Sequence, residues 1–312
     1  MMQAQPEQKT ILPFDRSRLT RFAWLSIAVA LITITMKTVA YLLTGSVGLL
    51  SDAIESIVNL IGAVMALGML TIAAMPPDEN HSYGHSKAEY FSSVVEGILI
   101  LVAAGSIAYA AIERLIHPKP LEQLGIGLFI SVLASLINFG ASRILMKAGK
   151  QHNSITLEAD AQHLMTDVWT SAGVLVGVGI VALTKWLPLD SIMGLIVATN
   201  IVWMGIKLIR RSVSGLMDVS LPEAEQKAID DVLAKYRQEG VEFHAVRTRQ
   251  AAARRFVSIH VLVPGEWTVH DAHHVAENIE HDIHTALGEA VVTTHVEPVE
   301  DELSMDDIPL DR

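Results

Sequence analysis

Cysteine is absent from the 312 residues of this chain. Disulfides and thiolate metal sites are therefore excluded, and a metal ion would have to be held by His, Asp, Glu, Asn or backbone oxygens. Charge is also scarce, because only 18% of the residues are Asp, Glu, Lys or Arg, whereas a soluble domain carries about 25%. The shortage falls in the first two thirds of the chain, which is not expected to be a water-soluble domain.

The last third of the chain has the opposite character. Residues 216–312 carry 20 acidic side chains against 8 Lys and Arg, whereas the preceding part is close to neutral. An acidic surface repels nucleic acid and anionic lipid and attracts cations. The sequence therefore predicts no nucleic-acid partner for this region.

Six apolar segments are about long enough to cross a bilayer. They cover residues 20–43, 47–75, 89–115, 122–146, 155–184 and 189–210. The pattern predicts a polytopic α-helical membrane protein with the lipid bilayer as its surroundings. Three parts are expected: an N-terminal segment over 1–19, a six-helix transmembrane domain over 20–213 and a C-terminal domain with an acidic tail over 214–312.

Lys and Arg are unevenly distributed over the short loops. Ten lie on the side of the two termini and three on the other side. The ten are Arg16, Arg18, Arg21, Lys87, Arg143, Lys147, Lys150, Lys207, Arg210 and Arg211, and the three are Arg114, Lys119 and Lys185. Because basic loops remain in the cytoplasm, both termini and the acidic domain are predicted to be cytoplasmic.

Two predicted spans share a polar pattern. The stretch "SDAIESIVN" contains Glu55 and Asn59, and "ADAQHLMTD" contains His163 and Asp167. Residues four apart lie on one helix face, and the two spans run antiparallel, so the pairs can face each other at similar depth. A divalent cation among the four side chains would neutralise charge that is expensive in a membrane. The alternative is that these groups satisfy one another, with the carboxylates protonated.

Among the other charged residues of the predicted spans, four bear on this site. Asp52 and Asp160, near the two pairs, are interpreted either as orienting groups or as structural carboxylates. Lys37 is expected to snorkel or to pair with a carboxylate, and Glu96 to lie at the membrane interface.

The loop "PPDENHSYGHSKAEY" contains Asp78, His81 and His85. At this spacing a loop can wrap two imidazoles and a carboxylate around one small cation. The alternative is a solvated loop, because Asp, Asn, Ser and Gly are ordinary turn residues.

The C-terminal part has the pattern of an α+β module. Helices are predicted over 222–239 and 268–287, and strands over 241–250, 254–264 and 290–299. The order is helix, strand, strand, helix, strand. This αββαβ order is the expected fold of the C-terminal domain.

Eight of the 13 histidines lie in this module. His244, His260 and His295 fall on the three predicted strands, and Glu297 shares a strand face with His295. Together with His273 on the packing helix, they indicate a metal site. The remaining four, His270, His274, His281 and His284, are interpreted as a solvated helix face.

The whole set of motifs resembles the cation diffusion facilitator family, particularly its bacterial zinc and ferrous-iron efflux members. The likeness rests on "LLTGSVGLLSDAIES", "DENHSYGHSKAEYFSS", "ADAQHLMTD", "LMDVSLPEAE", "HAVRTRQ", "SIHVLV" and "THVEP", which are spread over nearly the whole chain. It implies a multi-pass protein of the bacterial inner membrane. It also implies a homodimer of Y-shaped protomers that exchanges a divalent metal for protons.

The resemblance assigns the candidate sites by position. It implies a transport site at Glu55, Asn59, His163 and Asp167, a loop site at Asp78, His81 and His85, and a binuclear site at His244, His260, His273, His295 and Glu297. The last would lie in a ferredoxin-like cytoplasmic domain that strengthens the dimer. A charge interlock between the membrane halves falls on Lys87 and Asp218.

Three positions depart from the family pattern. Family members usually carry Asp or His at the position of Glu55 and Asp at that of Asn59, and Glu297 replaces a common aspartate. An amide oxygen is a weak ligand for zinc, whereas manganese, iron, cobalt and nickel tolerate oxygen-rich sites. Zinc is expected first among the transported ions, with iron, manganese, cobalt, nickel and cadmium as alternatives.

Two other classes of function share some of these features. A metal sensor or scaffold would need the cytoplasmic histidines but not the charged residues in the membrane. An intramembrane metalloenzyme would need an open coordination position beside a general base, and the chain has no H-E-x-x-H helix. The sequence therefore favours a secondary transporter, not an enzyme.

Overall fold

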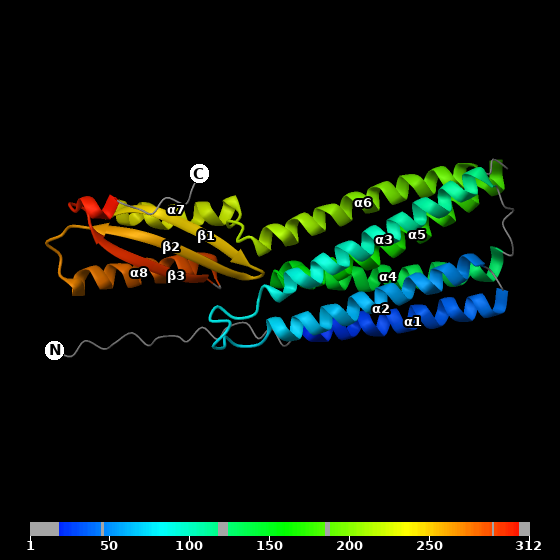
Figure 1. The fold of residues 1–312 in the computed structure, drawn as a ribbon, viewed down its shortest axis with the longest axis horizontal. Coiled ribbons are helices and arrows are strands. Elements are labelled where there is room, and N and C mark those ends of the chain that lie inside the picture. The colour runs from blue at the N-terminus through cyan, green and yellow to red at the C-terminus, as the bar shows by residue number, and fades with distance from the viewer. Residues whose placement is uncertain (1–18, 45–46, 118–123, 185–187, 289, 306–312) are drawn as a thin grey trace.

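The computed structural model describes residues 19–44, 47–117, 124–184, 188–288 and 290–305. Within them, a bundle of long helices and a smaller α+β domain lie end to end (Figure 1). Residues 1–18 of the predicted N-terminal segment, and residues 306–312 of the acidic tail, lie outside the described part.

The bundle contains six helices of 25 to 30 residues. They are α1 (Thr20–Thr44), α2 (Val47–Ala73), α3 (Ala88–Ile116), α4 (Leu124–His152), α5 (Ile155–Thr184) and α6 (Pro188–Leu216). In the described part of the chain, Thr20–Val39 and Ala88–Glu113 meet the length and composition needed to cross a membrane. Helix α6 ends three residues beyond position 213, where the sequence places the end of the transmembrane domain.

Apolar packing divides the bundle around α5. Leu70, Leu145 and Leu157 belong to a buried cluster of α1, α2, α4 and α5, whereas Ile100 and Ile201 belong to one of α3, α5 and α6. Large apolar side chains also cover the outside of the bundle, among them Trp24, Tyr109, Phe129, Leu136 and Trp203. Polar side chains in the interior and apolar ones outside are the arrangement that a lipid environment favours.

The C-terminal domain has the predicted αββαβ order. It contains α7 (Glu223–Arg237), β1 (Glu242–Ala251), β2 (Arg254–Val263), α8 (Val269–Leu287) and β3 (Ala290–Pro298), and a 3-10 helix, η2 (Glu302–Met305), follows. The strand order is β1-β2-β3, with β2 antiparallel to β1 and parallel to β3.

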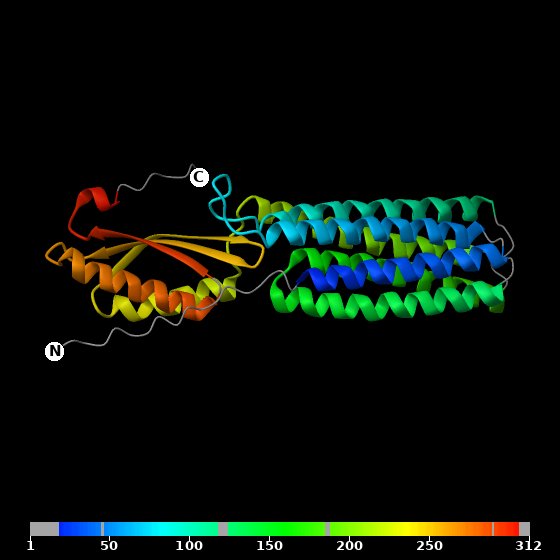
Figure 2. The ribbon, with the colours of Figure 1, turned by 90° about the horizontal axis from the view of Figure 1, so that it is seen from below.

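Helices α7 and α8 lie on the same side of the sheet (Figure 2). Val257, Ile259 and Val261 of β2 point to this side and are buried with Ile229 of α7 and Ile279 of α8. Since neighbouring strand residues point to opposite faces, His260 belongs to the face that the two helices leave open. The sheet therefore separates an apolar core from a face that carries histidine.

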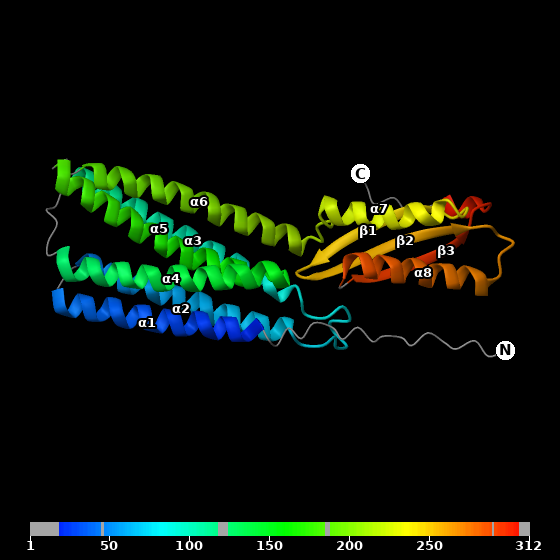
Figure 3. The same ribbon diagram turned by 180° about the vertical axis from the view of Figure 1, so that it is seen from behind.

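The turn between β1 and β2 lies at the end of the helix bundle that faces the C-terminal domain (Figure 3). The backbone N–H of Ala252 donates a hydrogen bond to Tyr90 Oη of α3 at 2.9 Å, and Arg254 donates to the carbonyl oxygen of Tyr83 at 3.1 Å. This turn therefore contacts both α3 and the loop between α2 and α3.

Candidate metal sites

The loop between α2 and α3 brings its predicted ligands together. His81 Nδ1 lies 3.1 Å from Asp78 Oδ1, and His85 Nε2 lies 3.3 Å from Asp78 Oδ2. One candidate ligand atom from each residue falls within 4.8 Å of the other two. Desolvation raises the pKa of Asp78, but the hydrogen bonds from His81 and Asn80 together outweigh it and hold the pKa below its usual range. Asp78 is therefore ionised at neutral pH beside two imidazoles, which is a set of donors that suits zinc and similar ions.

A second cluster lies on the open face of the sheet. His244 is paired with His260 across β1 and β2, and His260 with His295 across β2 and β3, so the three imidazoles form a row. Glu297 joins them: its oxygens lie 2.8 Å from His244 Nε2, 3.2 Å from His260 Nδ1 and 3.3 Å from His295 Nε2. His244, His260 and Glu297 offer ligand atoms within 4.8 Å of one another.

His273 is not part of this cluster in the structure. It is exposed on α8, with its ring 5.9 Å from that of His274. Among the contacts of the described residues, neither a hydrogen bond nor an ion pair joins it to the sheet cluster. Sequence periodicity places His273 on the packing helix correctly, but it does not reveal that this helix covers the sheet face opposite the histidine row.

The predicted transport residues are buried where α2 meets α5. Asn59, His163 and Asp167 are 4%, 4% and 3% exposed. A Cβ added to Gly62 would lie 3.5 Å from His163 Nδ1, and Asn59 precedes Gly62 by three residues, on the same face of α2. The predicted opposition of the two helices is therefore present at this depth. Glu55 and Asp52 also belong to α2, but their side chains lie outside the described residues.

Asp167 is held by two residues from other helices. Lys37 Nζ of α1 lies 3.2 and 3.3 Å from its two carboxylate oxygens, and Asn138 Nδ2 of α4 donates to Oδ2. Lys37 is only 1% exposed, so it pairs with a carboxylate and does not snorkel. The sequence interpretation named Lys37 but missed Asn138, whose only signal is an amide within an apolar segment.

Two further buried carboxylates lie near His163. Asp160 is 3% exposed and accepts a hydrogen bond from Ser26 Oγ at 3.0 Å. Glu96 is fully buried in protein, not at an interface as the sequence suggested, and Ser92 Oγ lies 3.4 Å from its Oε1. Glu96 Cγ would be 3.8 Å from a Cβ on Gly62, so it approaches the same point of α2 as His163.

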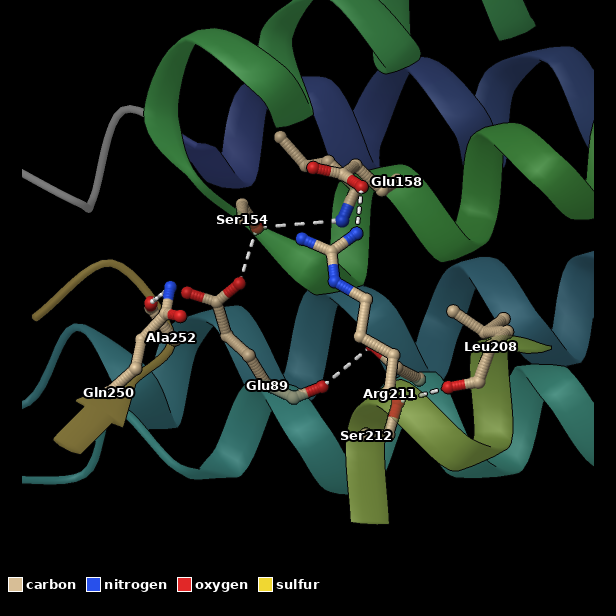
Figure 4. Close-up of polar contacts among 10 residues, drawn as sticks. Glu89, Ser154, Glu158, Leu208, Arg211, Ser212, Gln250 and Ala252 are labelled. Carbon is tan, nitrogen blue, oxygen red and sulfur yellow. Dashed lines mark hydrogen bonds and ion pairs between the residues drawn. The ribbon is translucent and has the colours of Figure 1, made fainter. Parts of the chain in front are cut away.

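A polar network fixes the inner end of α5 (Figure 4). Ser154, just before α5, donates to the buried carboxylate of Glu89 on α3, and Thr156 donates to the backbone oxygen of Glu89. Arg211 of α6 forms an ion pair with Glu158. These bonds hold α3, α5 and α6 together at the start of α5, on the N-terminal side of Asp160.

The residues of the predicted charge interlock are in contact within one protomer. Lys87 Nζ lies 2.9 Å from Asp218 Oδ1, and Arg249 of β1 lies 3.2 Å from the same oxygen. The hydrogen bond from Lys87, helped by that from Arg249, holds the pKa of Asp218 below its usual range against the effect of partial burial. The pair links the start of α3 to the segment that follows α6.

The chain matches two family models along most of its length. Residues 23–217 match the cation efflux transmembrane domain, and residues 221–299 match the cation efflux protein cytoplasmic domain. The chain belongs to the cation efflux, or cation diffusion facilitator, family. The family predicted from the sequence motifs is thus confirmed, as are a transporter rather than an enzyme and a helical transmembrane domain followed by a cytoplasmic αββαβ domain.

Individual relatives of this cation efflux protein agree with that assignment. An uncharacterized transporter of Synechocystis sp., sll1263, is 50% identical over 91% of this chain and 92% of its own length. The cation-efflux pump FieF of Shewanella oneidensis is 28% identical over 88% of this chain and 92% of its own. The solved structure of a putative zinc transporter, CzrB, in its zinc form is 31% identical, covers 26% of this chain and 91% of its own, and has a TM-score of 0.25.

Proposed function

We propose that this protein exports a divalent transition-metal cation across the bacterial inner membrane in exchange for protons. In this proposal all six long helices span the bilayer, both termini are cytoplasmic and the protein works as a homodimer. One observation carries the proposal: Asn59, His163 and Asp167 are buried where α2 meets α5, inside a cation efflux transmembrane domain. Such residues in a membrane interior are expected to lie on an ion pathway.

The exchange follows from the chemistry of His163 and Asp167. A proton and a metal ion compete for the same imidazole lone pair, so binding of one excludes the other. Lys37 supplies the positive charge beside Asp167 in the structure, and an incoming divalent ion would displace it. Rocking of the helices then turns the site from the cytoplasm to the outside, where protons replace the metal.

The two clusters outside the helix bundle are proposed to recruit metal. Asp78, His81 and His85 would collect it at the mouth of the bundle, and the histidine row with Glu297 would bind it in the cytoplasmic domain. The family resemblance adds His273 to the cytoplasmic site and makes that domain a dimer contact. Lys87 and Asp218 would then keep the membrane halves in register with it.

Zinc is the first candidate for the transported ion. Its support is the three imidazoles and one carboxylate of the sheet cluster, a donor set that zinc favours. Asn59 and Glu55 add oxygen donors to the transport site, which suits manganese, iron, cobalt or nickel better, and cadmium is a further alternative. Because the transported ion has to bind at the transport site, that site and not the sheet cluster would set the selectivity.

Flux across vesicles tests the proposal. Purified protein reconstituted with a pH-sensitive dye inside should move protons when zinc is added, and His163→Ala should lower that rate at least about a hundredfold because it removes the group that both ions share. His117→Ala, an exposed histidine at the outer end of α3, is the matched control. Unchanged exchange in His163→Ala would refute the role of His163, and a scaffold would give no flux at all.

The amide of Asn59 gives a test of selectivity. The same assay is run with zinc, iron, manganese, cobalt, nickel and cadmium, and repeated with Asn59→Asp. A carboxylate in place of the amide should raise the preference for zinc over manganese, because zinc binds an anionic oxygen better than a neutral one. An unchanged order of preference would show that this residue is not a ligand.

A further inference from the structure

Glu96 and Asp160 are two buried carboxylates of the bundle that the transport site does not use. Each has one oxygen within reach of a serine, Ser92 or Ser26. The other oxygens, Glu96 Oε2 and Asp160 Oδ2, are buried and have no hydrogen-bond partner. An unsatisfied buried carboxylate oxygen is costly, so a native structure is expected to give it a ligand.

Charge balance sets these two residues apart from their neighbours. Asp167 has Lys37, and Glu158 has Arg211. In the described part of the chain no Lys, Arg or His forms an ion pair with Glu96 or Asp160, and one oxygen of each carboxylate is left without a partner. Two like charges in a dry interior require either protons or a cation between them.

Their position lies on the route to the transport site. Asp160 precedes His163 by three residues, about 4.5 Å along the axis of α5 towards the cytoplasm. Glu96 and His163 approach Gly62 of α2 from α3 and α5, and their nearest atoms lie 3.8 and 3.5 Å from the point that a Cβ on Gly62 would occupy. A cation that leaves these carboxylates therefore has the imidazole as its next neighbour.

The donors of this pair differ from those of the transport site. Two carboxylates and two serine hydroxyls offer oxygen alone, which suits a divalent cation that keeps some of its water. Without an imidazole the pair holds zinc more weakly than a site with His163 would. A weaker site beside a stronger one lets an ion enter without being trapped.

We infer that Glu96 and Asp160 form a second cation site in the membrane domain, through which the divalent ion passes between the cytoplasm and His163. This inference rests on the proposed export function. Simple protonation of the pair, with no ion bound, is the competing outcome of the tests below.

The first test measures zinc transport by the full-length protein in vesicles as zinc is varied on the side of the C-terminal domain. Glu96→Gln combined with Asp160→Asn should raise the KM for zinc about tenfold, the loss of one modest site, with a smaller change in kcat. Glu96→Asp keeps the charge and should stay close to wild type. Glu113→Gln, at the outer end of the same helix, is the control.

The second test counts bound zinc at equilibrium and starts from a protein in which Glu96 and Asp160 are both intact. Full-length protein carrying His81→Ala, His260→Ala, His163→Ala and Asp167→Asn has lost one ligand or more from each of the other sites. It should still bind one zinc per chain weakly, and adding Glu96→Gln should abolish that binding. This measurement keeps the inference testable if the double variant fails to fold.

The outcomes separate the inference from the function on which it rests. An unchanged KM in the double variant, or no residual zinc in the second test, overturns the cation site and leaves a protonated pair. If His163→Ala abolishes exchange at the same time, the proposed export function survives. If His163→Ala also leaves exchange intact, the proposed role of His163 fails, whereas a wild-type protein without flux would refute the export function itself.

Discussion

At the scale of single residues, the ion pair of Lys37 and Asp167 has the greatest energetic consequence. Both side chains are almost completely buried and lie 3.2 Å apart. Taking two charges out of water is costly, so such a pair is poor evidence of net stabilisation, but removal of one partner leaves an uncompensated charge. Under the proposed export function, Lys37 would neutralise Asp167 until a divalent cation binds there.

Lys37→Met tests this role. The variant should be less stable by about 3 kcal/mol, because the buried carboxylate of Asp167 loses the positive charge that is paired with it. Added zinc should then raise the thermal unfolding midpoint by more in the variant than in the wild type, since the competitor of the metal is gone. Lys150→Met, at the exposed end of α4, is the control. An equal zinc-induced shift in both proteins would argue against competition.

Sequence reasoning identified which residues share a helix face but not what lies opposite them. The spacing of His163 and Asp167 predicted one face of α5, and the structure places that face towards α2. The partnership of Asp167 with Lys37 and Asn138 depends on how α1 and α4 pack, and no local pattern encodes that. Glu96 shows the same limit, because depth along a helix does not reveal which side of it meets protein.

At the scale of elements, the contact between α3 and the β1–β2 turn joins the two domains. Tyr90 is 4% exposed, and its hydroxyl accepts the N–H of Ala252. A Cβ on Gly215 would overlap the Tyr90 ring, so only glycine at this position of α6 leaves room for the ring. The ring of Tyr90 thus lies between α6 and the cytoplasmic sheet.

Tyr90→Phe should loosen this contact without disturbing the packing of the ring. The N–H of Ala252 is buried and would lose its acceptor, at a cost of about 1–3 kcal/mol. Hydrogen exchange followed by mass spectrometry should show faster exchange in the β1–β2 turn. Tyr109→Phe alters an exposed tyrosine on the same helix and should leave exchange unchanged. Equal protection of the turn in Tyr90→Phe would mean that this bond does not hold the domains together.

The elements of the cytoplasmic domain were predicted more fully than their contacts. Period-two and period-3.6 patterns located all three strands and both helices to within a few residues. They also placed Glu297 on the face of His295. The bulge between His244 and Arg247 in β1 was not predicted, because it depends on pairing with β2 and not on the sequence of β1 alone.

At the scale of the whole molecule, the position of the histidine row makes it a candidate for control of assembly. It lies on the face of the sheet that α7 and α8 do not cover, since both helices lie on the other side of the sheet (Figure 2). A metal there would draw β1, β2 and β3 together through Glu297 and its three imidazole neighbours. Metal bound to a domain that forms a dimer contact would couple to dimer affinity by linkage.

Zinc is therefore expected to strengthen the dimer, and a chelator to weaken it. The dissociation constant of purified full-length protein, measured by analytical ultracentrifugation in detergent, should rise at least about tenfold when EDTA removes zinc, a typical coupling of 1–3 kcal/mol. His260→Ala removes the central imidazole and should make the dimer insensitive to both reagents. His281→Ala, an exposed histidine of α8, should respond like the wild type. If wild-type affinity were the same with zinc and with EDTA, the histidine row would have to serve recruitment alone, because a site uncoupled from assembly cannot shift it.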